Sequence, residues 1–222
     1  ARRKVGEIAS DVEAAGGDIN AYTSFDQTVY HVTIASRELD VALDILADAV
    51  QHSAFDAAEL ERELEVVLEE LRRGKDSPTR TVSEQLFALA FRGHNYGRPI
   101  IGYEETVERF TRDQILAFYR KWYQPANMLL VVAGDVDPEH VFRRAEELFP
   151  PRETTPLPER QRGRVEPQTG LRFGEERMDV QETQLAFAWH GPALADLDTP
   201  AVDVLSVLLG TGESSRLFRR VK

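Results

Sequence analysis

The chain has 222 residues, of which 42% are apolar and 29% are charged, and its formal net charge is −11. It can build one large domain, or one domain and part of another, and its acidic balance argues against nucleic acid as the main partner. It contains no cysteine, which excludes disulfides, thiolate catalysis and cysteine-ligated zinc, and no apolar run approaches the roughly 18–20 residues of a membrane-spanning helix.

The first 55 residues predict a helix, a strand pair and a second helix. Ile8 and Val12 recur at helical spacing, and Gly16-Gly17 is a typical helix end. Segments 19–25 and 28–35 are rich in β-branched and aromatic residues, which predicts two strands joined by a short turn. The apolar positions of 39–50 fall on one helical face.

Residues 56–149 predict four helices and a further strand. The long helix begins at Asp56, a suitable N-cap, and ends near Gly74. The elements that follow are a helix from Pro78, a helix over 111–123, a strand over 128–133 and a helix from Asp137-Pro138 to about Phe149.

Residues 150–170 contain five prolines among many charged residues, which is typical of a linker. Strands are then expected over 171–179 and 183–190, and helices over 199–209 and 214–221. We therefore expect a first domain over 1–150 whose N-terminal part is missing, a linker over 151–170 and the truncated beginning of a second domain over 171–222. The blocks of helices and strands indicate an α+β fold with helices on one face of a mostly antiparallel sheet.

The long helix carries two unusually placed carboxylates. At about 100° per residue, an apolar stripe forms from Leu60, Leu64, Val67 and Leu71, while Glu61, Glu65 and Glu69 point away from it. Glu63 and Glu70 instead fall nearly in register between this stripe and Val66. A buried, unpaired carboxylate costs several kcal/mol, so both either reach water or an arginine at the edge of the core, or serve a function.

Five blocks, in order along the chain, resemble the M16 family of inverted-motif zinc peptidases, which includes pitrilysin and the mitochondrial processing peptidases. The blocks are Gly16–Ser24 (GGDINAYTS), Glu61–Glu70, Asn95–Gly102 (NYGRPIIG), Trp122–Val136 and Leu208–Phe218. The resemblance spans essentially the whole chain. It implies a metallopeptidase-like α/β sandwich, similar to that of LuxS, and a clamshell of repeated domains that encloses a peptide.

In this family, zinc is held by two histidines of a His-x-x-Glu-His helix and by one downstream glutamate. The resemblance implies that Glu70 is this metal ligand and that Glu63 is an additional carboxylate of the catalytic site, which orients the ligands. It also implies that Asn20, Ala21, Tyr22 and Thr23 form a platform to which an extended peptide adds as a strand. The alternative for this segment is ordinary sheet pairing, with Tyr22 in the core.

The sequence departs from the family at the metal site, because His31, His52, His94, His140 and His190 do not form a His-x-x-Glu-His motif. Either the motif lies before Ala1, or the parent is a non-catalytic relative that serves as a partner or scaffold subunit. Retention of both Glu63 and Glu70 favours the first explanation. The 222 residues alone are expected to be inactive and to bind zinc weakly. The family's transition-state arginine and tyrosine would lie beyond Lys222.

The expected protein is a soluble zinc endopeptidase of the cytoplasm or periplasm. Its expected partners are peptides or unfolded protein segments, and a dimer mate or second half that completes the chamber. A small-molecule enzyme lacks support, because the sequence has no phosphate loop or nucleotide fingerprint.

Overall fold

The computed structural model describes residues 2–4, 6–150, 156–157, 159–160 and 162–221. Lys222 and part of the proline-rich stretch, both used in the sequence analysis, lie outside the described residues. The fold is α+β, as predicted, with many helices and a small antiparallel sheet.

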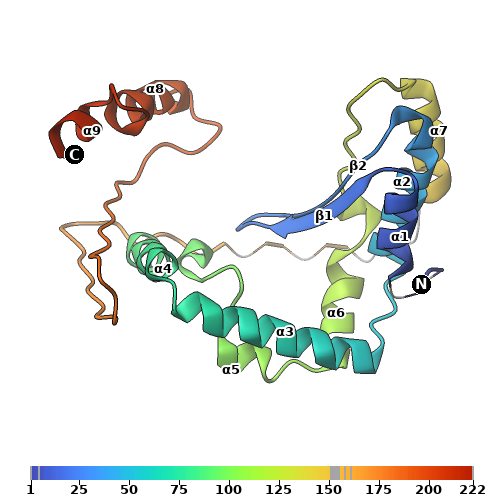
Figure 1. Ribbon diagram of the computed structural model, residues 1–222, viewed down its shortest axis with the longest axis horizontal. Coiled ribbons are helices and arrows are strands. Elements are labelled where there is room, and N and C mark those ends of the chain that lie inside the picture. Colours follow the sequence, from blue (N-terminus) through green and yellow to red (C-terminus); the bar gives the residue numbers. More distant parts are fainter. Residues whose placement is uncertain (1, 5, 151–155, 158, 161, 222) are drawn as a thin grey trace.

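The sheet is a hairpin of β1 (Asp18–Thr23) and β2 (Thr28–Thr33), which confirms the predicted strand pair (Figure 1). Its antiparallel register pairs Ala21 with Tyr30 and Thr23 with Thr28. The turn is stabilised by Ser24, whose amide donates to the Gln27 carbonyl at 2.8 Å.

Helices α1 (Glu7–Ala14), α2 (Leu39–Gln51) and α7 (Pro138–Leu148) form the main core with the base of the hairpin (Figure 1). Val12, Leu43 and Ile45 are almost fully buried there. Gly16 ends α1 with a φ of 72°, in the left-handed region, which confirms the predicted helix end.

The N-terminal segment is tied to α2 by ion pairs. Arg2 and Arg3 contact Asp44 at 3.0 and 2.8 Å, and both also reach Asp48, whose side chain is only 2% exposed. The carboxylates of one helix thereby hold the segment that precedes α1.

Helices α3 (Ala57–Lys75) and α4 (Pro78–Ala90) run along the opposite side of the molecule (Figure 1). The predicted cap is confirmed, since the Asp56 carboxylate accepts from the amides of Ala58 and Glu59 at 3.0 and 3.2 Å. The remaining elements of this part are α5 (Glu104–Val107), α6 (Arg112–Trp122) and 3₁₀ turns at Ser36–Glu38, Asn95–Gly97 and Pro125–Asn127.

Three predicted strands are wrong as paired elements. Segments 128–133, 171–179 and 183–190 form no β-ladder with any described residue, and side chains such as Leu129 and Trp189 are 88% and 86% exposed. Their apolar composition suits a strand, but a strand also needs a neighbour to which its backbone can hydrogen-bond. No described segment pairs with any of the three through backbone hydrogen bonds of a sheet.

The C-terminal helices α8 (Thr199–Gly210) and α9 (Arg216–Val221) pack on each other and lie apart from the main core (Figure 1). The segment that precedes α8 in sequence contacts the C-terminal end of α4. There the Arg172 guanidinium donates to the carbonyls of Leu89 and Ala90 at 2.7 and 3.2 Å. None of the described helices is both long and apolar enough to cross a membrane.

Candidate functional site

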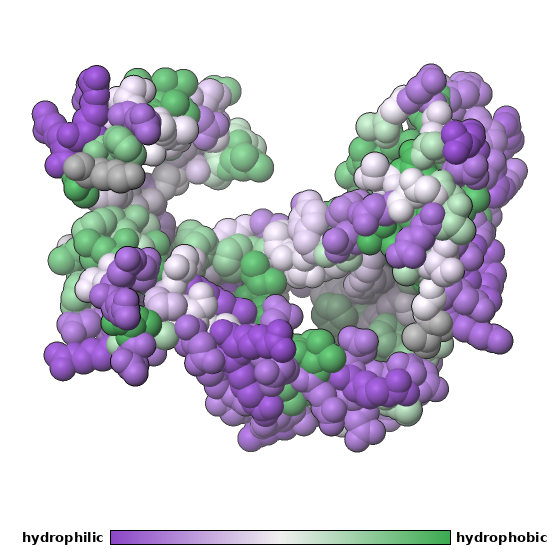
Figure 2. All heavy atoms as spheres, viewed as in Figure 1, coloured by the Kyte–Doolittle hydropathy of each residue, from purple (hydrophilic) through white to green (hydrophobic). Residues whose placement is uncertain are grey.

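An open groove of about 1020 Å³ lies between the hairpin, α3 and α4. Its walls are formed by Ala21, Tyr22 and Thr23 of β1, Thr28 and Tyr30 of β2, Glu70 of α3, Phe87 and other residues of α4, and the loop Arg98–Ile101. In the space-filling view, this side of the molecule is hollowed between the α1, α2 and α7 end and the C-terminal helices (Figure 2). Segments far apart in the sequence thus meet at one concave surface.

Strand β1 offers an edge for binding at this groove. Among the described residues it pairs with β2 alone, so its other edge carries backbone groups without a strand partner. Asn20 uses this edge locally, since its Oδ1 accepts from the Ala21 amide at 2.8 Å. Three of the four residues of the predicted platform, Ala21, Tyr22 and Thr23, line the groove, and Tyr22 is 53% exposed rather than in the core.

Glu70 is the carboxylate that α3 contributes to the groove. It is exposed, and it makes no hydrogen bond or ion pair with any described residue, whereas Glu69 on the neighbouring face pairs with Arg73. Glu61 and Glu65 also lack partners within the described chain, but they do not line the groove. The position of Glu70 is therefore what distinguishes it from the other carboxylates of the helix.

Glu63 lies on the same face of α3 as Glu70, two turns earlier, which is about 10 Å along the helix axis. It is exposed and is not a lining residue of the groove. Val66, between the two on this face, is 60% exposed, whereas Leu71 of the apolar stripe is buried. The face with the two carboxylates therefore points to open space, and neither carboxylate is buried against the core.

The described residues do not form a metal site by themselves. No group of three or more His, Asp or Glu side chains within the described part of the chain is arranged to hold an ion. A catalytic zinc needs three protein ligands and an open position. Glu70 alone does not meet this requirement, so zinc at this groove would need donors from elsewhere.

The hairpin is joined to α6 through tyrosine hydroxyl groups. Tyr30 Oη and Tyr123 Oη lie 2.8 Å apart, and Tyr119 Oη donates to the Val50 carbonyl of α2 at 2.9 Å. Burial, together with the hydrogen bond to Tyr123, raises the pKa of Tyr30 well above its usual value. The hydroxyl of this groove residue is therefore a protonated, structural group at neutral pH.

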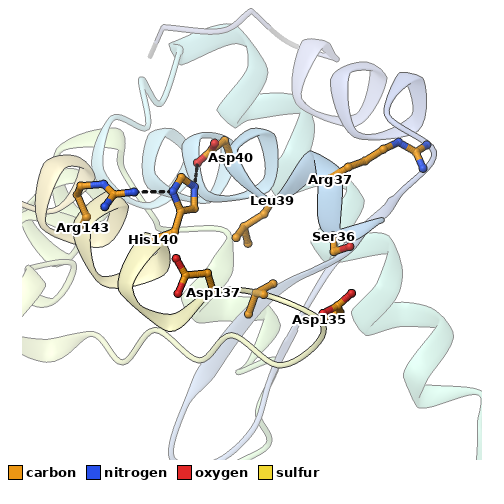
Figure 3. Close-up of a pocket in the computed structure, with 9 residues that line it drawn as sticks. Ser36, Arg37, Leu39, Asp40, Asp135, Asp137, His140 and Arg143 are labelled. Carbon is orange, nitrogen blue, oxygen red and sulfur yellow. Dashed lines mark hydrogen bonds and ion pairs between the residues drawn. The ribbon is translucent and has the colours of Figure 1, made fainter.

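A second cavity, of about 430 Å³, lies at the N-terminal ends of α2 and α7 (Figure 3). There His140 Nε2 contacts Asp40 Oδ1 at 3.0 Å and Nδ1 contacts Arg143 at 2.9 Å. Because a guanidinium only donates, Nδ1 accepts and Nε2 donates to Asp40. Slight burial opposes the shift, but His140 and Arg144 together lower the pKa of Asp40. The network links two helices and contains no residue of the groove.

The groove also contains residues that sequence reasoning did not single out as site residues. Phe25, Phe87 and Ile100 supply its apolar lining, and Arg80 and Arg98 supply cations. Phe25 and Phe87 come from different elements, and their ring centroids are 5.1 Å apart. The resemblance of the Asn95–Gly102 block to the family pointed to this loop. That the loop lies beside the hairpin is seen only in the tertiary structure.

Comparison with known proteins gives consistent matches. The family model described as Insulinase (Peptidase family M16) matches residues 1–104, and the Peptidase M16 inactive domain matches residues 109–222. An uncharacterized zinc protease of Rickettsia bellii is 33% identical, over 99% of this chain and 53% of the relative. The chain therefore spans about half the length of that relative.

Solved structures show the same likeness. A protease from Helicobacter pylori is 27% identical with a TM-score of 0.83, covering 100% of this chain and 55% of that chain. A mutant of the ferredoxin protease FusC, in complex with Arabidopsis ferredoxin, is 25% identical with a TM-score of 0.62, covering 70% of this chain and 18% of that chain.

Proposed function

This chain belongs to peptidase family M16, the insulinase family, and from this membership we propose that it is part of a zinc-dependent endopeptidase. Its substrates would be peptides or unfolded protein segments held along β1. One observation carries the proposal: the edge of β1 and the carboxylate of Glu70, neither of which has a partner among the described residues, line the same groove.

In this proposal the groove binds an extended peptide by strand addition. Backbone hydrogen bonds to the edge of β1 that faces away from β2 would supply affinity with little dependence on sequence. Ala21 would release Asn20 Oδ1 and donate to the peptide instead. Tyr22 and Thr23, already at the groove, would contact its side chains.

Glu70 would supply one zinc ligand, and the two histidines would come from residues outside these 222. Bound zinc would provide a Lewis acid that activates water. Glu63, two turns away on the same helix face, would orient the ligands without touching the metal. The described residues contain no complete set of zinc ligands, so the proposal needs ligands from outside this chain segment.

We also propose that the full-length protein encloses its substrate in a chamber with a second M16 half. The FusC complex, in which a protease of similar fold is bound to a ferredoxin, supports a protein substrate. The proposed division of this chain is a first domain over 1–150, a linker over 151–170 and part of a second domain over 171–222.

A non-catalytic subunit is the second candidate. The observation that favours it is the match of residues 109–222 to a domain described as inactive, whereas the match of residues 1–104 to the insulinase peptidase domain favours the peptidase. A His-x-x-Glu-His motif in the full-length sequence would decide for the peptidase, and its absence would decide for the subunit.

The direct test is hydrolysis of an unfolded protein, fluorescently labelled β-casein, by the full-length protein. We expect cleavage that stops on chelation, returns with zinc and is abolished by Glu70→Gln. Glu65→Gln, on the outward face of the same helix, is the matched control and should leave the rate unchanged. Cleavage that survives chelation, or equal rates for both variants, would refute the proposed function.

A further inference from the structure

The tip of the β1–β2 hairpin is held by contacts other than those at its base. Helices α1 and α2 pack on the strands, whereas the turn residues 24–27 project toward α4 (Figure 1). A two-stranded hairpin is marginally stable in water by itself. Ordering of the tip, and hence of the outer end of β1, therefore depends on what it touches there.

Tyr96 makes the polar contact to this tip. Its hydroxyl donates to Asp26 Oδ2 at 2.5 Å, across 70 residues of sequence. Its ring lies 5.1 Å from that of Phe25, which in turn stacks on Phe87 of α4 at 5.1 Å. The hydrogen bond to Asp26 raises the pKa of Tyr96, so the hydroxyl remains a donor throughout the neutral range.

Tyr96 is itself held firmly. It lies in the 3₁₀ turn Asn95–Gly97, and its amide donates to His94 Nδ1 at 3.2 Å. Its ring packs edge-on against those of His94 and Phe91, with centroids 4.5 and 5.4 Å away. A group fixed in this way can transmit the position of α4 to the hairpin.

We propose that Tyr96 is a positioning residue that sets the distance between the peptide-binding edge of β1 and Glu70. The helix pair α3 and α4 carries Glu70, and the Phe25, Phe87 and Tyr96 contact joins this pair to the tip of β1. Tyr96 is not a lining residue of the groove, so it acts through Asp26 and Phe25. The inference rests on the proposed function, because it concerns the same groove.

The test compares three variants in the full-length protein. Tyr96→Phe removes only the hydroxyl, Asp26→Ala removes the acceptor, and Asp26→Asn retains an oxygen that can accept the bond. Tyr103→Phe, at another exposed tyrosine, is the matched control. Two readouts are used: amide hydrogen exchange of residues 20–27, and affinity for labelled β-casein with zinc removed by a chelator, so that neither requires catalysis.

We expect exchange at residues 20–27 to rise about 2- to 10-fold in Tyr96→Phe and Asp26→Ala, as loss of one hydrogen bond implies. Casein affinity should fall by a similar factor, while the melting temperature stays near that of wild type. Asp26→Asn should retain most of the exchange protection and most of the casein affinity, and Tyr103→Phe should change neither.

Unchanged exchange at the tip would overturn the proposal, and so would faster exchange with unchanged casein affinity. A wild-type protein that binds no casein would refute the proposed function instead. The exchange data would then decide separately whether Tyr96 orders the hairpin.

Discussion

At the scale of single residues, substitution of Glu63 in the full-length protein should have a larger effect than substitution of the outward Glu65. Glu63→Gln keeps the shape of the side chain and removes its charge, so the zinc affinity or the peptidase rate should fall about 10–100-fold, as for a group that orients metal ligands. Titration with zinc and the initial rate of casein cleavage measure this. A change as small as that of Glu65→Gln would mean that Glu63 is an ordinary surface residue.

The buried Asp48 predicts a stability effect at low pH. Burial would raise the pKa of Asp48, but the backbone and side-chain hydrogen bonds from Arg2, with the nearby Arg3 charge, outweigh it and lower this pKa. A depressed pKa contributes stability that is present above the unfolded value of about 3.9 and is lost as pH falls below it. The free energy of unfolding should therefore decline below about pH 4.

Asp48→Asn should reduce the free energy of unfolding at pH 7 by about 1–3 kcal/mol, because it removes charge from a hydrogen-bonded buried group. It should also flatten the decline at low pH. Urea unfolding at several pH values measures both effects, and Asp18→Asn at an exposed position is the control. An unchanged pH dependence in Asp48→Asn would show that the ion pairs with Arg2 and Arg3 contribute little.

The unusual carboxylates of α3 could be located from the sequence, but their surroundings could not. The helical wheel separated Glu63 and Glu70 from the outward glutamates of the helix, and the apolar stripe ending at Leu71 is indeed on the inner side. The wheel could not show that the face with Val66 points to open space. That depends on where α3 lies relative to the hairpin, which is tertiary information.

At the scale of elements, local chemistry predicted helices better than strands. Caps such as Asp56 and the Gly16 turn are determined by short-range backbone geometry, and both are where they were expected. The strands over 128–133, 171–179 and 183–190 were wrong as paired elements, because pairing depends on a neighbour that sequence composition does not specify. The prediction of the hairpin was correct because the partner of each strand is the next strand in sequence.

Asp56→Ala should destabilise the fold by about 1 kcal/mol, within the range of about 0.5–2 kcal/mol measured for N-caps. The carboxylate accepts from two backbone amides of α3, which would lose their partner. Urea unfolding provides the measurement. Glu61→Ala, on the exposed face of the same helix, should stay within about 0.5 kcal/mol, and equal losses in both variants would contradict the capping role.

At the scale of the whole molecule, apolar surface is distributed unevenly. The buried apolar side chains lie between residues 12 and 141, whereas α8 exposes Val204, Leu205, Val207 and Leu208. Arg172 and its neighbours connect this C-terminal part to α4. Composition predicts a division at the proline-rich stretch, whereas the packing of α8 and α9 on each other, apart from the main core, is visible only in the structure.

The proposed division predicts where a protease cuts. Limited proteolysis of the folded full-length protein should cleave first between Pro150 and Gly170, since proline-rich, charged segments without periodic apolar residues are accessible. Mass spectrometry of the early fragments identifies the sites. Early cleavage mainly within α3 would contradict the division and the position of α3 beside the groove.

The central claim is that Glu70 is a zinc ligand, and zinc content tests it most directly. The full-length protein should contain one zinc per chain after dialysis, and Glu70→Gln should contain almost none while remaining folded by circular dichroism. The 222 residues alone should bind zinc weakly, because one carboxylate cannot hold a tetrahedral ion. Stoichiometric zinc in Glu70→Gln, or micromolar or tighter binding by the 222 residues alone, would contradict the account.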